Sequence, residues 1–161
     1  MAKLKRKPKA THSSMITYSD LTEEQRQLYL KALIAVARAD GHLDEEETHF
    51  FLRIAEGMGL DKEVAQGYLA EETGPILDIG QIPPLHNAAG ALILRDLAAM
   101  AVVNNELGEK EEDLIFAIGK AMQFSQEEIN EFLDWAFMGL QWQLKSAALL
   151  QRYAQTPASN S

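Results

Sequence analysis

The feature that most constrains this chain is an internal repeat with an offset of 64 residues, the spacing between Asp40 and Asn104. Shifting the first half by this distance aligns the two halves without a gap, and the matches include small and acidic residues as well as apolar ones. A shared helical period alone does not produce such matches, so they indicate a duplicated unit. The matched pairs are Leu33 with Leu97, Ala35 with Ala99, Ala37 with Ala101, Leu43 with Leu107, Glu47 with Glu111, Ile54 with Ile118 and Met58 with Met122.

Each unit has the pattern of helix, elbow, helix, turn and helix, and the fold class that we predict is all-α. Two such units bury their apolar faces against each other around a pseudo-two-fold axis, which gives a bundle around two central hydrophobic helices. We therefore place Ile34, Val36, Ala98 and Met100 in the shared centre. The predicted helices span about 22–39, 44–59, 61–70, 85–103, 109–122 and 125–153, with Gly139 as a candidate break in the last.

Composition changes define the ends of the predicted domain. Residues 1–18 form a basic arm and residues 154–161 a small polar tail, and we expect both to be disordered. Residues 19–153 form a single helical domain. Within it, repeat one spans about 21–70, a connector marked by Gly and Pro spans 71–84, and repeat two spans about 85–153.

The distribution of charge restricts the partners of the folded body. The net charge is −9, and five of the 15 basic residues precede the first acidic residue, Asp20, so the rest of the chain holds ten basic against 24 acidic residues. A body this acidic does not suit nucleic acid, whose phosphates need a basic face. The basic arm suits peripheral contact with an anionic membrane, or is simply solvated.

The chain also lacks the features of a secreted or membrane-spanning protein. There is no cysteine, which excludes disulfides and thiolate metal sites. The basic start is not followed by an apolar signal segment, and the most apolar stretch is interrupted by Arg95 and Asp96. We expect a cytoplasmic protein.

Acidic residues gather in the segment that we call the first elbow, residues 38–47. Asp40, Asp44 and Glu47 lie at a helix end, at the next helix start and one turn further on. If the loop folds back, their carboxylate oxygens converge, and an all-oxygen ligand set favours Ca²⁺ or Mg²⁺ over Zn²⁺. The EF-hand pattern does not fit, because the sixth and twelfth positions counted from Asp40 lack its glycine and glutamate.

The same residues also have a purely structural interpretation. Gly41 suits a helix C-terminus, Asp44 suits a helix N-cap, and Glu47 suits its reciprocal partner three residues later. Only Asp40 has no role in that account. Both interpretations, a metal site and a pair of helix caps, stay open at this point.

The equivalent segment of the second unit, which we call the second elbow (residues 102–111), is poorer in acids. Asn104 and Gly108 stand where the first elbow has Asp40 and Asp44. Glu111 remains, and we expect it to contribute to a site in the first elbow across the pseudo-two-fold axis.

No motif for catalysis or nucleotide binding is present, so we predict neither an enzyme nor an organic cofactor. The sequence Glu46-x-x-His49 matches one element of di-iron bundles, but such bundles need a second copy, and the equivalent residues are Lys110 and Asp113. Trp135, Phe137 and Trp142 are expected in the core. A dimer or partner surface is the alternative for Trp142.

Two segments of the first unit resemble the TerB-like domain of tellurite-resistance proteins: Ala39-Asp40-Gly41 with Glu47 after an acidic turn, and Ile54-Ala55-Glu56-Gly57-Met58-Gly59-Leu60. The likeness covers roughly residues 21–142, and the doubled unit resembles the duplication of that family. The resemblance implies a helical bundle around two central hydrophobic helices, a divalent-metal site at the acidic elbows and a role in metal stress near the membrane. Carried over, the implied metal site falls on Asp40, Asp44, Glu47 and Glu111.

We therefore expect a non-enzymatic helical module that binds a divalent cation at the first elbow and acts in metal or chemical stress response through partner proteins. The alternative is a metal-free protein-interaction or homodimerising adaptor that acts through a helical face around residues 135–142.

Overall fold

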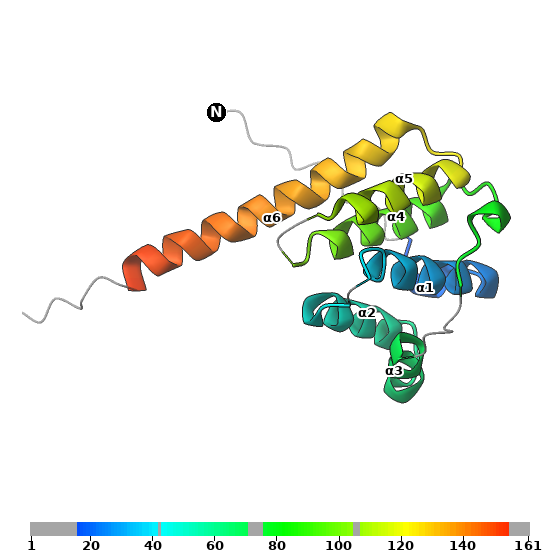
Figure 1. The fold of residues 1–161 in the computed structure, drawn as a ribbon, viewed down its shortest axis with the longest axis horizontal. Helices are drawn as coiled ribbons and strands as arrows, with labels where there is room; N and C mark the ends of the chain where they lie inside the picture. The colour runs from blue at the N-terminus through cyan, green and yellow to red at the C-terminus, as the bar shows by residue number, and fades with distance from the viewer. Residues whose placement is uncertain (1–15, 42, 71–75, 105–106, 155–161) are drawn as a thin grey trace, which may run out of the picture.

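The computed structural model describes residues 16–41, 43–70, 76–104 and 107–154. Within these ranges it is all-helical and holds no β-strand, which confirms the predicted fold class. Figure 1 shows the arrangement of the helices. They are α1 (Glu23–Ala37), α2 (Glu45–Gly57), α3 (Lys62–Ala70), α4 (Ala88–Ala101), α5 (Glu109–Ala121) and α6 (Gln126–Ala154), with short 3₁₀ helices η2 (Tyr18–Asp20) and η3 (Ile79–Gln81).

Local capping sets where the first and last helices begin. Thr22 caps α1, since its Oγ1 accepts a hydrogen bond from the backbone N–H of Gln25 at 3.2 Å while the Gln25 side chain accepts one from the N–H of Thr22 at 2.9 Å. Ser125 and Glu128 form the same reciprocal pair before α6, at 3.1 and 2.9 Å. These pairs satisfy backbone donors that the first helical turn leaves without partners.

The core lies between α1 and α4, which pack against each other at the centre of the bundle. The four residues placed there by the sequence are all buried, at 3% exposure or less: Ile34, Val36, Ala98 and Met100. α4 also contacts α2, α5 and α6, and this explains why it is apolar on nearly all sides. α2 and α5 stand 64 residues apart at both bounds. The pseudo-two-fold relation between the halves stays a prediction.

α4 begins at Ala88 rather than at the predicted Leu85. Asn87 caps it, with Oδ1 accepting from the N–H of Gly90 at 3.2 Å. The backbone N–H of Leu85 instead donates to the carbonyl of Met122 at 2.9 Å, which ties the connector to the end of α5. Leu85 is buried although it lies before the helix. Apolar periodicity alone therefore placed the start of α4 three residues too early.

α6 runs without a break through Gly139 and projects well beyond the other helices (Figure 1). The predicted break at Gly139 is therefore wrong. All residues from 141 to 154 are exposed. The prediction that Trp135 and Trp142 are core residues is also wrong, because their exposed fractions are 51% and 76%. Phe137 is half-buried against the core.

Two residues that the sequence analysis assigned to the basic arm pack on the body. Ile16 and Tyr18 are half-buried against the core, and the remainder of the arm, residues 1–15, lies outside the described residues, as does the tail from 155. None of the described helices combines the length and apolar character needed to cross a membrane.

Candidate functional site: the acidic elbow

The first elbow joins α1 to α2 through a loop that contains one left-handed residue. Gly41 has a φ of +84°, a conformation that side-chain-bearing residues rarely adopt, so the chain needs glycine there, as predicted. Asp44 then caps α2, with Oδ1 accepting from the backbone N–H of Glu47 at 2.8 Å. The N-cap role predicted for Asp44 is confirmed. Gly41 lies three residues beyond Arg38, the C-cap of α1, so its left-handed backbone turns the loop and does not cap the helix itself.

Glu47 does not complete the reciprocal cap that its position predicts. It is only 2% exposed, and its Oε1 accepts a hydrogen bond from Asn104 Nδ2 at 3.5 Å. Its Oε2 is buried and has no hydrogen-bond partner within the described part of the chain. A buried polar atom left in this state costs about 1–3 kcal/mol, so a purely structural role does not explain the position of Glu47.

Asn104 links the two elbows. Its Nδ2 also donates to Asp44 Oδ2 at 2.6 Å, so one amide group from the loop after α4 serves two acids of the first elbow. Sequence reasoning missed this role, because it treated the change from Asp40 to Asn104 only as a loss for the second elbow. The repeat offset was the available signal, since it places Asn104 opposite the acidic loop.

The acids predicted from the sequence all act on Glu47. Burial raises the pKa of Glu47 to about 8, and the negative charges of Asp44, Glu111 and Asp40 add to the increase, in that order. Glu111, near the start of α5, is itself only 2% exposed, whereas Asp40 lies at the surface. The charges of the other three predicted residues thus act on the buried carboxyl group of Glu47, which keeps its proton at neutral pH.

The donors at the first elbow fit a hard divalent cation in kind. They are carboxylate and amide oxygens, which are the ligands of Ca²⁺ and Mg²⁺, and Glu47 Oε2 is a buried acceptor without a donor. Among the described residues, no group of three or more His, Cys, Asp or Glu side chains is gathered closely enough to hold a metal ion. A cation would therefore have to draw the carboxylates closer together than they now stand.

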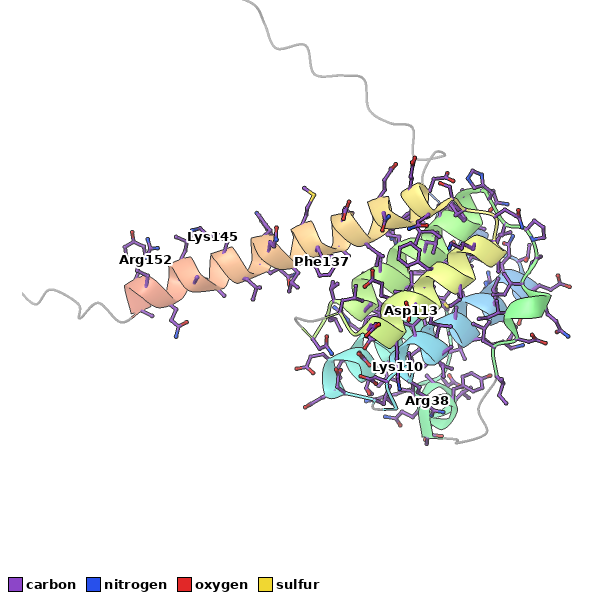
Figure 2. All side chains as sticks on the ribbon, turned by 45° about the horizontal axis from the view of Figure 1, so that its top comes forward. Arg38, Lys110, Asp113, Phe137, Lys145 and Arg152 are labelled. Atoms are coloured by element: carbon purple, nitrogen blue, oxygen red, sulfur yellow. The ribbon has the colours of Figure 1, made fainter. Side chains whose placement is uncertain are left out.

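The histidines of this region add no ligand that the structure describes at the site. His49 is exposed on α2, and His42 and Glu106 lie outside the described residues. Lys110 and Asp113, the counterparts of Glu46 and His49 in the second unit, are also exposed near the start of α5 (Figure 2).

Comparison with protein families links the first unit to known proteins. Residues 5–67 match the family described as tellurite resistance protein TerB. The matched segment includes α1, the first elbow, α2 and part of α3, and it ends before the second unit begins. Comparison with curated proteins and with solved structures gave no match. The chain is therefore similar to TerB over residues 5–67, and its fold is all-helical throughout its described residues.

Proposed function

We propose that this chain is a non-enzymatic TerB-like helical module that binds a divalent cation at the first elbow. The observation that carries the proposal is Glu47 Oε2, a buried carboxylate oxygen without a hydrogen-bond partner in the described structure. The nearby charges of Asp44, Glu111 and Asp40 support it, because they raise the pKa of Glu47 and would be neutralised by a cation.

In this proposal the ligands come from both halves of the chain. Asp40, Asp44 and Glu47 belong to the first elbow, Glu111 belongs to α5, and Asn104 of the second elbow hydrogen-bonds Asp44 and Glu47. The cation would supply positive charge that offsets the repulsion among the carboxylates. Binding would release the proton of Glu47 and hold the α1–α2 loop against α5, which gives the module a metal-dependent state.

We propose in addition a role in metal or chemical stress response. It is supported by the description of the matched family as a tellurite resistance protein. We propose that partner proteins in the cytoplasm bind the metal-bound state.

Thermal unfolding of chelator-stripped protein tests cation binding directly. Ca²⁺, Mg²⁺, Mn²⁺ and Zn²⁺ are added one at a time. An ion at about 100 times its Kd adds about 2.7 kcal/mol to the free energy of unfolding, which raises the midpoint by roughly 5–10 °C in a chain of this size.

Three variants separate the site from general ionic effects. Glu47→Gln should abolish the ion-dependent rise, as should Asp40→Ala, whereas Glu45→Gln should keep it because Glu45 is exposed on α2. No rise with any of the four ions at millimolar concentration, or an equal rise in Glu47→Gln, would overturn the proposal.

One observation favours the second candidate, a homodimerising adaptor. The projecting part of α6 exposes large apolar side chains that no described element covers. They include Trp142, Leu144, Leu150 and Tyr153, with exposed fractions from 48% to 76%. Large apolar groups at the surface mark partner surfaces.

Light scattering coupled to size exclusion tests the dimer. The intact protein should have the mass of two chains, and the double variant Trp142→Glu with Leu150→Glu should have the mass of one. Gln143→Glu, on the same exposed turn, is the control for added charge. A single-chain mass for the intact protein at high concentration would remove this candidate.

A further inference from the structure

A second cluster of polar groups lies away from the elbow, around Asp96 in the middle of α4. Asp96 is only 4% exposed, yet its carboxylate is fully engaged. The hydroxyl of Tyr18 donates to Oδ2 at 2.6 Å, the hydroxyl of Tyr29 donates to the same oxygen, and Arg95 Nε donates to Oδ1 at 2.9 Å. Arg95 therefore balances the charge of Asp96.

The two tyrosines act only as neutral donors in this cluster. Burial raises the pKa of the Tyr18 hydroxyl and that of the Tyr29 hydroxyl, and the negative charge and hydrogen bond of Asp96 raise both further. Neither hydroxyl ionises at neutral pH. The cluster of Tyr18, Tyr29, Arg95 and Asp96 is thus neutral overall, and it neither repels an anion nor attracts a cation.

A pocket of about 410 Å³, which we call the Asp96 pocket, opens beside this cluster. Its volume lies within the range of about 300–1,000 Å³ that is usual for small-molecule sites. Arg53 of α2 and Arg95 of α4 both line it, and Phe50 and Trp135 supply aromatic walls from α2 and α6. The pocket brings two guanidinium groups together in a protein whose net charge is −9.

Arg53 gives the Asp96 pocket an uncompensated positive charge. Its guanidinium lies 5.9 Å from the centre of the Phe50 ring, and no ion pair joins it to an acidic residue in the described ranges. Because Arg95 is already balanced by Asp96, the charge that faces the pocket is that of Arg53. Both guanidinium groups have N–H donors to spare, which suits a carboxylate or phosphate.

A second pocket, of about 530 Å³, continues from the first, and we call it the apolar pocket. The two pockets share four lining residues: Phe50, Arg53, Ala99 and Trp135. Beyond them the lining is mostly apolar, with Val102, Val103, Met138 and Trp142. A positively charged end thus leads into an apolar groove between α2, α4 and α6.

We propose that the joined pockets bind an amphiphilic organic anion, with its carboxylate or phosphate head at Arg53 and Arg95 and its apolar body along the apolar pocket. The positive charge of Arg53 favours an anionic head, and the aromatic and aliphatic lining favours an apolar body of several carbons. The site is separate from the acidic elbow and does not depend on a bound metal.

Tryptophan fluorescence gives a direct readout, because Trp135 and Trp142 are the two tryptophans of the chain and both line the apolar pocket. Four probes separate head from body: decanoate, acetate, decan-1-ol and decyltrimethylammonium, each below its micelle-forming concentration. Decanoate should change the emission saturably. Acetate should give no saturable change, and the neutral and cationic probes should bind about tenfold more weakly than decanoate or worse.

Variants then locate the head group. Arg53→Gln should weaken decanoate binding about tenfold. Lys145→Gln makes the same change of charge on the outer half of α6 and should leave the affinity unchanged (Figure 2). Arg53→Lys keeps the charge and should stay within a few-fold of the parent protein. Both Arg53 variants should fold, since Arg53 is exposed.

Three outcomes would overturn the inference. Absence of any saturable change with decanoate would remove the site. Equal binding of decan-1-ol and decanoate would show an apolar groove without anion recognition. An equal loss in Arg53→Gln and Arg53→Lys would assign the effect to packing against Phe50 rather than to charge.

Discussion

The two elbows occupy equivalent positions in the repeat, but they differ in chemistry. In the first, Asp44 caps α2 with its side chain; in the second, Gly108 precedes α5 and offers no side-chain cap. The first loop carries Asp40 where the second carries Asn104. The second elbow still contributes to the first, because the Asn104 amide donates hydrogen bonds to Asp44 and Glu47.

In the predicted duplication, the two elbows thus differ in what they contribute around Glu47. A loop with the acids of the first elbow at both positions would bring further carboxylates to Glu47, which already keeps its proton at neutral pH. An amide in one loop supplies a donor where another acid would add repulsion. The first elbow supplies the carboxyl groups, and Asn104 of the second elbow donates hydrogen bonds to two of them.

The largest expected effect is the pH dependence of the metal-free protein. The pKa of Glu47 rises from 4.5 in the unfolded chain to about 8 in the folded one, so between these values only the folded state keeps the proton. The free energy of unfolding should fall as the pH rises from about 5 to about 8, by about 3–4 kcal/mol. Urea unfolding in chelator measures it. Glu47→Gln should flatten this slope and Glu45→Gln should not; an unchanged slope in Glu47→Gln would contradict the assignment.

The helices that lead into the elbows, α1 and α4, should also differ in how they tolerate alanine at equivalent positions. A Cβ at Gly90 of α4 would lie 1.9 Å from the carbonyl oxygen of Leu85, which is backbone and cannot move aside. Gly90→Ala should destabilise by about 3 kcal/mol. The equivalent change in α1, Arg26→Ala, should cost about 1 kcal/mol or less, since it removes partly exposed hydrogen bonds. Chemical unfolding of both variants measures the contrast, and equal losses would refute it.

Asn104→Asp tests the specialised role of the second elbow. The variant replaces the shared donor by a carboxylate beside Asp44 and Glu47, and should destabilise the metal-free protein by about 2 kcal/mol at about pH 8. The loss should shrink at about pH 5, where Glu47 is protonated in both proteins. Thermal melts at the two pH values measure it. A midpoint equal to that of the parent protein at both pH values would show that the amide is dispensable.

The smallest expected effect concerns the missing cap of α5. Gly108→Ser would add a side-chain acceptor at the N-cap and should stabilise by a few tenths of a kcal/mol, about the usual difference between Gly and Ser at this position. Asp44→Ala makes the opposite change at the first elbow and should cost about 1 kcal/mol. Differential scanning calorimetry of the two variants measures whether each change in stability has the expected sign. A loss of stability in Gly108→Ser would point to crowding against Glu111, which lies 3.3 Å from a Cβ placed there.

Helices and caps were predictable because their causes are local. Thr22, Asp44 and Ser125 cap through atoms three residues away, and sequence spacing alone reveals such pairs. The glycine at position 41 was expected to end α1, whereas its left-handed backbone turns the loop beyond the C-cap Arg38. The central placement of α1 and α4 followed from the repeat, which pairs Ile34 and Val36 with Ala98 and Met100.

The remaining features depend on contacts between distant segments. The bonds of Asn104 cross 60 and 57 residues, and no local pattern predicts which amide meets which acid. Tyr18 reaches Asp96 across 78 residues, so the end of the expected arm packs against the core. The exposure of Trp142 has a different cause. Apolar spacing predicts the side of a helix that avoids water, but not whether another element is long enough to cover it.

The projecting half of α6 has a consequence for how quickly its backbone exchanges hydrogen with solvent. A lone helical segment of about 14 residues is marginal in water, so residues 141–154 should fray and their amides should exchange with deuterium far sooner than those of residues 126–140. The boundary between slow and fast exchange should fall near Leu140. A partner that binds residues 141–154 should slow the exchange of their amides and move that boundary toward the C-terminus. The exchange pattern of α6 would therefore report whether a partner is bound.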